Sequence, residues 1–404
     1  MWSWASTPLS PLEWLLLLPV AGGSLYSLAC LSAMARLRLR AGGVPREACT
    51  GPESAPWPAV TLLKPVCGLE KGLRENLVSA CLQDYPGPLQ VIFSAQDEND
   101  PAVPLLREVQ REVGAGRVEV VVDSTPTAPN GKIRNLLGAF PHARHDLLVI
   151  SDSDVRLRPD YLRAIVAPLA ADPDAGCACT FYRAAGARRW FEILEQLTLN
   201  ADFVPNLVFA QVTGASRFLL GASTALSRAT LAEIGGLAAL ADYLVEDNEM
   251  GRRILAAGKR IAVVPYFVDT LVDLQTPGQW WHHQVYWDQN TRSANPWGHF
   301  GTLFVRAVPF ALLFALARLA HAPDALAAAV PAAALAVRLG AAGLFMGWGL
   351  GDRSGVRRLA WLPLRDLSGL VSAVLAFTRP TVVWRGVRFL LTRDGRMVPE
   401  EPAA

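Results

Sequence analysis

Two aspartates stand two residues apart, directly after an apolar run. Asp152 and Asp154 follow residues 146–151, a run typical of a buried strand. Two carboxylates placed in this way can bind one divalent cation. Hard oxygen ligands suit Mg²⁺ or Mn²⁺, and these ions usually also hold substrate phosphates. The alternative is a polar turn with helix-capping aspartates. After a buried strand we favour the cation site, which would neutralise a diphosphate leaving group.

Polar side chains also follow other expected strands. Lys64 ends the run 59–64, and Asp97 follows the run 89–95. Because ligands of open α/β sheets bind outside the carboxyl ends of the strands, both residues are candidates for contact with a nucleotide. Asp97 can accept a hydrogen bond from a uracil ring or a ribose hydroxyl, or it belongs to a solvated acidic turn. Lys132 stands near the start of an expected helix. It either binds a phosphate, aided by the helix N-terminus, or is an exposed helix residue.

Asp247 and the segment 279–287 supply further candidates. An acidic residue at the start of a helix, as Asp247 is, is expected for capping alone. Its functional interpretation is a general base that deprotonates an acceptor hydroxyl. Trp280 and Trp281 are typical either of a membrane-interface belt or of rings that stack on sugars and bases, whereas we expect His283 and Trp287 to contact the substrate. Adjacent histidines rarely converge on one metal, so the segment does not indicate a zinc site.

The elements that must position these residues lie within 58–268. Strand-like runs cover 59–64, 89–95, 117–123 and 146–151, and a helix-like run follows each of them. This alternation predicts a mainly parallel sheet with helices on both faces.

The composition indicates a mixed architecture. Of the 404 residues, 51% are hydrophobic and 18% are charged, which is too apolar for a soluble protein and too charged for a protein buried in a membrane. The net charge of +2 gives no basic face, so we expect no nucleic-acid partner. The six cysteines have no zinc spacing and are interpreted as reduced thiols in a cytosolic domain. Abundant alanine and arginine hint at a bacterial source.

Three apolar segments predict membrane spans. Residues 12–35 are long enough to cross a bilayer. The basic run that follows, 36–40, marks the cytosolic side, and no basic region precedes the apolar core as a signal peptide requires. Residues 301–320 and 325–350 predict a hairpin that leaves the cytosol and returns, because the arginine-rich loop 351–358 favours the cytosolic side.

A fourth apolar stretch, 359–378, carries Arg365 and Asp366 near its middle. Charges at mid-bilayer depth are costly, so we favour a re-entrant or interfacial helix followed by a basic cytosolic tail. The protein is thus predicted to be a multi-pass protein of the cell (inner) membrane with its catalytic domain in the cytosol. The predicted divisions are an anchor (1–40), a linker (41–57), a cytosolic catalytic domain (58–300), a hairpin (301–350) and the last helix with the tail (351–404).

An ordered set of short motifs resembles the ceramide glucosyltransferase-like enzymes of glycosyltransferase family 21, which have a GT-A fold. The resemblance covers about residues 58–300 and the flanking membrane layout. The matching stretches are Leu62–Pro65, Asp84–Pro86, Gln96-Asp97, Asp100–Ala102, Lys132, Asn135, Asp152-Ser153, Gly221, Ser223-Thr224, Gly235-Gly236 and Glu246-Asp247.

The resemblance implies roles for particular residues. The three aspartates of the family correspond to Asp97, Asp152 and Asp247, the last being the base. The family's (Q/R)xxRW motif falls at His283–Trp287, with histidine at its first position and Tyr286 in place of the arginine. The diphosphate therefore has one fewer cationic partner, which bears on the choice of substrate.

The resemblance also implies an activity, namely inverting transfer of a hexose from a UDP-sugar, first of all UDP-glucose, to the hydroxyl of a ceramide-like lipid. A divalent cation, Mg²⁺ or Mn²⁺, would assist at Asp152 and Asp154. Two alternatives stay open: transfer of N-acetylglucosamine from its UDP-sugar to a hopanoid polyol, and a catalytically inactive lipid-binding scaffold. A processive polysaccharide synthase is disfavoured by the small number of spans and the altered motif.

Overall fold

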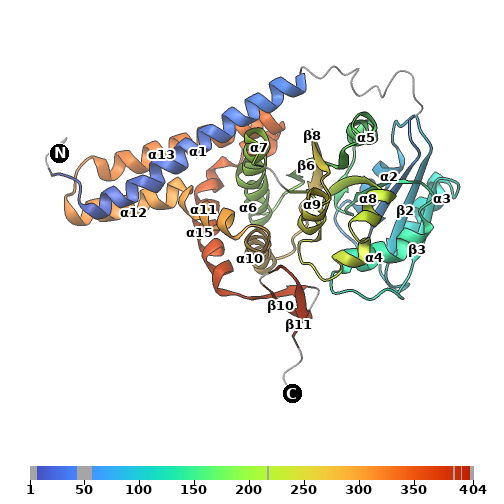
Figure 1. Cartoon of the computed structure of the whole chain (residues 1–404). Coiled ribbons are helices and arrows are strands. Elements are labelled where there is room, and N and C mark those ends of the chain that lie inside the picture. Colours follow the sequence, from blue (N-terminus) through green and yellow to red (C-terminus); the bar gives the residue numbers. More distant parts are fainter. Residues whose placement is uncertain (1–6, 43–56, 216–217, 385–386, 393, 401–404) are drawn as a thin grey trace. The chain divides into compact units, whose positions relative to one another are not determined.

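The computed structural model describes residues 7–42, 57–215, 218–384, 387–392 and 394–400, and it divides into two compact units (Figure 1). The sheet unit comprises Arg40–Gly186, Ser216–Asp273 and Thr381–Ala404. The helical unit comprises Met1–Leu39, Ala187–Ala215 and Leu274–Pro380. Residues 43–56, which make up most of the predicted linker 41–57 and include Cys49, lie outside the described residues.

The sheet unit is built on one eight-stranded sheet in the order β3-β2-β1-β4-β7-β6-β8-β5. Its strands are β1 (Val60–Pro65), β2 (Leu89–Ala95), β3 (Val118–Val122), β4 (Leu147–Ser151), β5 (Val155–Arg156), β6 (Ala175–Ala185), β7 (Ser223–Ser227) and β8 (Arg260–Leu271). The four predicted strands form the parallel half, β3-β2-β1-β4.

The other half of the sheet contains two strands, β5 and β7, that run against the other six, so the prediction of a mainly parallel sheet is confirmed. Strand β7 runs antiparallel to both β4 and β6, and β5 runs antiparallel to β8, whereas β6 and β8 are parallel. The sheet is therefore mixed. Helices between the strands are α2 (Leu73–Cys81), α3 (Val103–Val113), α4 (Gly131–Ala139), α5 (Tyr161–Ala171), α8 (Arg228–Glu233) and α9 (Glu246–Ala256).

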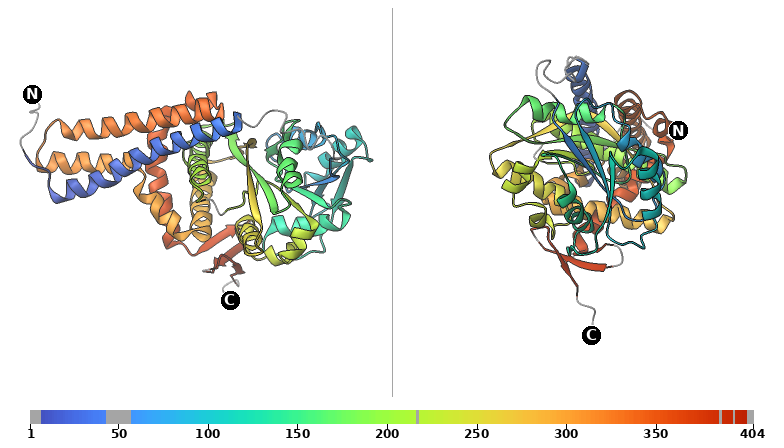
Figure 2. Two further views of the ribbon diagram at one scale, coloured as in Figure 1. Left: turned by 45° about the horizontal axis from the view of Figure 1, so that its top comes forward. Right: turned by 90° about the vertical axis from the view of Figure 1, so that its right-hand side faces the viewer.

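The central strands form the core of this unit. Every residue of β1 and β4 is buried, as expected for strands covered on both faces. The strands end at the same edge of the sheet, so the segments that follow them come together there (Figure 2). Reduced thiols were predicted for all six cysteines, and the five that the structure describes are free thiols.

The tail after residue 380 forms a three-stranded antiparallel ribbon in the sheet unit, made of β9 (Thr381–Trp384), β10 (Val387–Leu391) and β11 (Met397–Pro399). The backbone N–H of Met397 donates to the carbonyl of Asp242 at 2.7 Å, and that of Leu244 donates to Gly395 at 3.1 Å. The ribbon thus supports the loop that leads into α9, a contact that the basic character of the tail did not predict.

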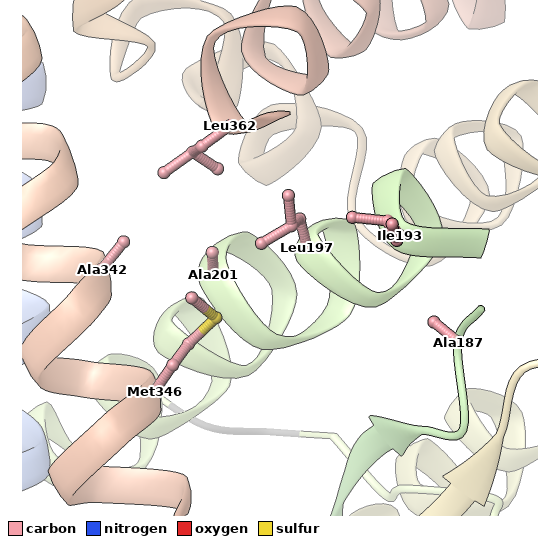
Figure 3. Close-up of a cluster of buried hydrophobic side chains, with 7 residues drawn as sticks. All are labelled: Ala187, Ile193, Leu197, Ala201, Ala342, Met346 and Leu362. Carbon is pink, nitrogen blue, oxygen red and sulfur yellow. The ribbon is translucent and has the colours of Figure 1, made fainter. Parts of the chain in front are cut away.

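The helical unit contains α1 (Pro11–Gly42), α6 (Trp190–Thr198), the π-helical turn η3 (Leu199–Phe203), α7 (Val204–Thr213), α10 (Pro277–Ala294), α11 (Pro296–Phe304), α12 (Ala307–His321), α13 (Leu326–Leu344), η5 (Phe345–Leu350), α14 (Arg353–Val356) and α15 (Leu362–Thr378). Helices α1, α12 and α13 lie side by side (Figures 1 and 2) and share a small core of Val20, Ala307, Ala311 and Ala334. A second core, shown in Figure 3, joins α6 and η3 to α13, η5 and α15 through Leu197, Ala201, Ala342, Met346 and Leu362.

Helices of this unit match the predicted spans by length and composition. The spans Pro11–Leu39 and Leu326–Leu350 coincide with the anchor and with the second arm of the hairpin. The first arm is a broken pair, Pro296–Phe304 and Ala307–His321, bent by 45°. Leu359–Thr378 is also long and apolar enough to cross a membrane, and its two charged residues are buried within the unit. The re-entrant path of this segment stays a prediction.

Candidate active site

The Asp152-Ser153-Asp154 turn between β4 and β5 is held from beneath by Lys64. The lysine is fully buried in β1, and its Nζ donates to the carbonyls of Asp152 at 2.7 Å and Val155 at 3.0 Å. Burial lowers the pKa of Lys64 to about 8, although Asp154 and Asp152 oppose this shift. The structure therefore gives Lys64 a supporting function under the turn, and its predicted contact with the nucleotide remains untested.

Lys132 links the turn to the start of α9. Its Nζ lies 2.7 Å from Oδ1 of Asp152 and 3.1 Å from Oε1 of Glu246, and it donates to the carbonyl of Gly221 at 2.9 Å. Burial alone would lower the pKa of Lys132, but the two carboxylates outweigh burial and raise it. Lys132 is therefore a permanently charged centre between two parts of the site, at the N-terminus of α4.

Asp247 is fixed through its carboxylate. Its Oδ2 accepts a hydrogen bond from the N–H of Gly221 at 2.7 Å, and its Oδ1 accepts one from the N–H of Asn248 at 2.7 Å. Gly221 is required here, because a Cβ at that position would lie 2.7 Å from Oδ2 of Asp247. Burial, and then the neighbouring Glu246, raise the pKa of Asp247 to about 7.

Asn130 explains why α4 and α9 begin next to each other. Its Oδ1 caps α4 by accepting from the N–H groups of Lys132 and Ile133. Its Nδ2 donates to the carbonyl of Tyr243 at 2.9 Å and to Oε2 of Glu246 at 3.1 Å. One short side chain thus positions the start of α4 against the first turn of α9, which carries the predicted base.

Asp97 lies at the exposed end of β2. Its Oδ1 accepts from the backbone N–H of Asn99 at 2.9 Å, which is the turn geometry that the acidic cluster favours. The adjacent Gln96 contacts the carbonyl of Gly131 and accepts from Nε of Arg134 at 2.8 Å, so the β2 end is tied to α4. The carboxylate of Asp97 therefore faces solvent beside the helix that carries Lys132.

Asp154 shares its surroundings with other carboxylates. Burial, then Asp152, then Glu70 raise its pKa to about 7. Glu70 itself accepts a hydrogen bond from Ser153 Oγ at 2.6 Å, which places it against the same turn. An excess of like charge is what a divalent cation would relieve, and the oxygen donors fit Mg²⁺ or Mn²⁺.

The fit to a cation depends on further ligands. In the part of the chain that the structure describes, no three His, Cys, Asp or Glu side chains converge as a metal site. Asp152 and Asp154 alone supply too few ligands for six-fold coordination, so the remaining positions would fall to phosphate oxygens and water. The donor set therefore fits a cation that arrives with a diphosphate.

His283 and Trp287 belong to the helical unit, in α10. Nε1 of Trp287 donates to Nε2 of His283 at 2.9 Å, and Nδ1 of His283 lies 2.9 Å from Oε1 of Glu195. Because an indole N–H can only donate, Nε2 accepts and the ring proton resides on Nδ1, facing Glu195. Gln284 contacts the same glutamate. The two predicted residues form one network, and their contact with substrate stays a prediction.

Sequence reasoning found most of the acidic site but not its connections. Asp152, Asp154, Lys132 and Asp247 are brought together in the sheet unit, with Lys64 beneath them. The residues that were missed as participants are Glu70, Asn130, Gly221 and Glu246. Gly221 and Glu246 stood in the motif set, and Asn130 is a typical helix-capping type, but their mutual contacts join distant parts of the chain.

The fold and the site together define a membrane-associated α/β protein with a cluster of acidic side chains at the carboxyl ends of its parallel strands. The model of the family "Glycosyl transferase family 21" matches residues 21–397, and the chain belongs to this family. This confirms the resemblance seen in the sequence, and with it the expected enzyme class and the GT-A fold class with flanking membrane helices.

Two relatives show the extent of the similarity. Ceramide glucosyltransferase 1 of Caenorhabditis elegans is 22% identical over 206 residues, which is 51% of this chain and 44% of that protein. The ceramide glucosyltransferase of Pyricularia oryzae is 31% identical over 162 residues, 37% of this chain and 30% of that protein. The chain thus spans less than half the length of either relative.

Among solved structures, a mannosyltransferase from Pyrobaculum calidifontis in complex with GDP-Man and Mn²⁺ is 20% identical. The alignment covers 87% of this chain and 99% of that one, with a TM-score of 0.44.

Proposed function

We propose that this protein transfers a hexose from a UDP-sugar, first of all UDP-glucose, to a hydroxyl of a ceramide-like membrane lipid, with inversion at the anomeric carbon. One observation carries this proposal: Asp247 is a fixed, half-buried carboxylate whose pKa is raised to about 7. A general base works best when its pKa lies near the operating pH. Family membership and the flanking apolar helices support the rest.

Asp247 is assigned the role of base. The acceptor oxygen forms a bond to the anomeric carbon while its proton passes to a carboxylate oxygen of Asp247. The bond between that carbon and the diphosphate oxygen breaks, and UDP leaves with the electron pair. The hydrogen bond from the N–H of Gly221 keeps the carboxylate in one orientation, so no reorganisation is needed when the proton moves.

Lys132 and the Asp152–Asp154 turn are assigned to the donor. A divalent cation held by the two aspartates would, when bound, neutralise charge that develops on the diphosphate. Lys132 already lies 2.7 Å from Asp152, at a helix N-terminus suited to phosphate. The arginine of the family motif is replaced by Tyr286 in this chain, and the permanent charge of Lys132 offers the diphosphate another cationic partner. Asp97, exposed beside the same helix, is assigned to the nucleoside.

The membrane arrangement of this proposal follows the charge pattern. The candidate span Pro11–Leu39 ends in the arginine-rich stretch 36–40, so the chain after it would lie in the cytosol, where nucleotide sugars are available. We propose a multi-pass protein of the cell (inner) membrane, whose bilayer supplies the acceptor. The division into a catalytic domain at 58–300 and flanking membrane segments belongs to the same proposal.

The experiment is a product screen with detergent-purified protein. UDP-glucose, UDP-galactose and UDP-N-acetylglucosamine are each combined with ceramide, diacylglycerol and bacteriohopanetetrol, with and without Mn²⁺, and products are read by mass spectrometry. We expect hexosylceramide that depends on the cation. An N-acetylhexosaminyl hopanoid would keep the mechanism and replace both substrates. Absence of every product, and of UDP-sugar hydrolysis, would favour the inactive scaffold.

A further inference from the structure

The helical unit contains a buried cluster of charges whose members are not among the predicted site residues. Asp202 lies in the π-helical turn η3, Arg338 in α13, and Arg365 and Asp366 in α15. Arg306 stands at the break between α11 and α12. π-helical turns and broken helices recur at functional sites of membrane proteins, where irregular backbone lines a cavity.

Two of the three arginines are fully engaged. Arg338 forms a bidentate pair with Asp366, with both distances at 2.9 Å, and donates to the carbonyl of Ala201 at 2.8 Å. Arg365 lies 2.5 Å from Oδ2 of Asp202 and 3.4 Å from Oδ1 of Asp366. These pairs join α13, α15 and η3, and they account for the two charges near the middle of the segment 359–378.

Arg306 is different from its neighbours. Its side chain is 7% exposed, yet Nε and Nη1 have no hydrogen-bond partner among the described residues. Its nearest carboxylate oxygen, Oδ2 of Asp202, is 3.5 Å from Nη1 and is already paired with Arg365. A buried guanidinium with unmet donors is costly, so a ligand that accepts from it is strongly favoured.

Arg306 lines a small cavity, together with Tyr26, Asp202, Asn206 and Arg338. The cavity has a volume of about 30 Å³, enough for one or two atoms of oxygen size but not for a whole head group. Tyr26 donates from its hydroxyl to Asn206 at 3.0 Å, so the lining of the cavity includes polar groups besides the charged residues.

An apolar groove lies on two of the same helices. Leu28 and Leu31 of α1, with Leu344 and Trp348 of α13 and η5, line an open groove of about 460 Å³. Leu28, Leu344 and Trp348 are about half exposed. The cavity is lined by residues next to them in sequence, namely Ser27, Cys30 and Phe345. Polar and apolar sites thus share α1 and the end of α13.

We propose that the cavity at Arg306 binds a hydrogen-bond-accepting head-group oxygen of a neutral membrane lipid, an amide or ester carbonyl, while an alkyl chain of that lipid lies in the groove. The formal charges of Arg306, Arg338 and Arg365 are balanced by Asp202, Asp366 and Asp288, which accepts from Ser372 at 2.6 Å. A balanced cluster favours a neutral acceptor oxygen over a phosphate. The inference rests on the proposed function in taking this lipid as the sugar acceptor.

The test compares Arg306→Gln with Arg338→Gln in the full chain in detergent micelles. Binding of short-chain ceramide, short-chain diacylglycerol and phosphatidylglycerol is measured by native mass spectrometry without any donor. We expect Arg306→Gln to weaken binding of the two neutral lipids by about tenfold or more, as loss of a hydrogen bond to a charged group does. Its Tm should fall much less than that of Arg338→Gln, because two of its guanidinium nitrogens have no hydrogen bond to lose, whereas Arg338 forms a bidentate pair.

A second variant keeps the charge and moves it. A Cβ at Gly369 would lie 2.6 Å from Nη1 of Arg306, so Gly369→Ala should displace the guanidinium and weaken neutral-lipid binding without removing the arginine. Unchanged lipid binding in both variants would overturn the inference and leave the cavity to water. So would a fall in Tm for Arg306→Gln as large as that for Arg338→Gln, or a preference for phosphatidylglycerol. Lipid binding is measured without a sugar donor, so this test remains valid even if the protein transfers no sugar.

Discussion

The acidic site of the sheet unit and the charge cluster of the helical unit are built from the same residue types with opposite balances. In the sheet unit, five carboxylates surround two lysines: Glu70, Asp152, Asp154, Glu246 and Asp247 against Lys64 and Lys132. In the helical unit, Arg306, Arg338 and Arg365 pair with Asp202 and Asp366, and a third aspartate, Asp288, interacts electrostatically with Arg306 and Arg365.

The difference in balance has physical consequences. Burial, and then the excess of negative charge, raise the pKa of Asp154 and Asp247 to about 7, so this site is stabilised by whatever brings positive charge or a proton. In the balanced cluster, bidentate pairs join separate helices and breaking one leaves a buried charge unpaired. An unbalanced cluster therefore indicates ligand chemistry, and a balanced one indicates structure, with Arg306 as the exception.

The largest expected effect is at the base. Asp247→Asn should lower kcat for sugar transfer by about 10²–10⁴-fold, since the amide still accepts the Gly221 hydrogen bond but takes no proton. The Kd for UDP, measured by calorimetry, should change little. The matched control is Asp242→Asn, which changes an exposed aspartate in the loop that precedes α9 and should transfer normally. Normal turnover by Asp247→Asn would remove the base assignment.

Substitutions in the balanced cluster of the helical unit should change the stability of the protein rather than its catalytic rate. Arg338→Gln breaks the pair with Asp366 and should lower the free energy of unfolding by roughly 3–5 kcal/mol, the cost of leaving one partner of a buried pair alone. The loss of stability is measured as a lower Tm in a thermal unfolding curve recorded in detergent. Arg357→Gln changes an exposed arginine of the same unit and should leave Tm unchanged. Equal stability of the two variants would mean that the Arg338 pair does not hold these helices together.

A smaller effect is expected from the glycine beside the base. Gly221→Ala places a Cβ 2.7 Å from Oδ2 of Asp247 and should move the carboxylate by a few tenths of an ångström or more, lowering kcat by about 10²-fold. Gly116→Ala is the control, because nothing lies within 4 Å of its Cβ. If Gly221→Ala retains full kcat with an unchanged fold, the placement of Asp247 does not limit the reaction.

The sequence predicted the strand ends of the parallel half because their runs of Val, Ile and Leu are continuous, and it therefore found Asp152, Asp154 and Lys132. It missed Glu246 as a partner of Lys132 because the pair joins residues 114 positions apart, and no local pattern encodes such a contact. The burial of Lys64 beneath the turn is equally invisible in a pattern of residue types.

The membrane helices show the same limit. Arg365 and Asp366 look like an obstacle to membrane insertion when only their own helix is considered. Their partners, Asp202 and Arg338, come from other helices, so the cost of burying these charges depends on tertiary contacts. The antiparallel direction of β7 was likewise not predictable, because strand direction depends on the path of the chain between strands.

The pH dependence of transfer tests the central claim most directly. Asp247 can act as a base only as a carboxylate, and its pKa is raised to about 7. As the pH falls below about 7, the carboxylate is protonated and kcat/KM should fall by about tenfold per pH unit. The measurement is kcat/KM for the substrate pair found in the screen, from about pH 8 to about pH 5. An inflection near 7 is predicted; a rate that stays constant down to about pH 5, as an aspartate with an ordinary pKa would give, contradicts the account.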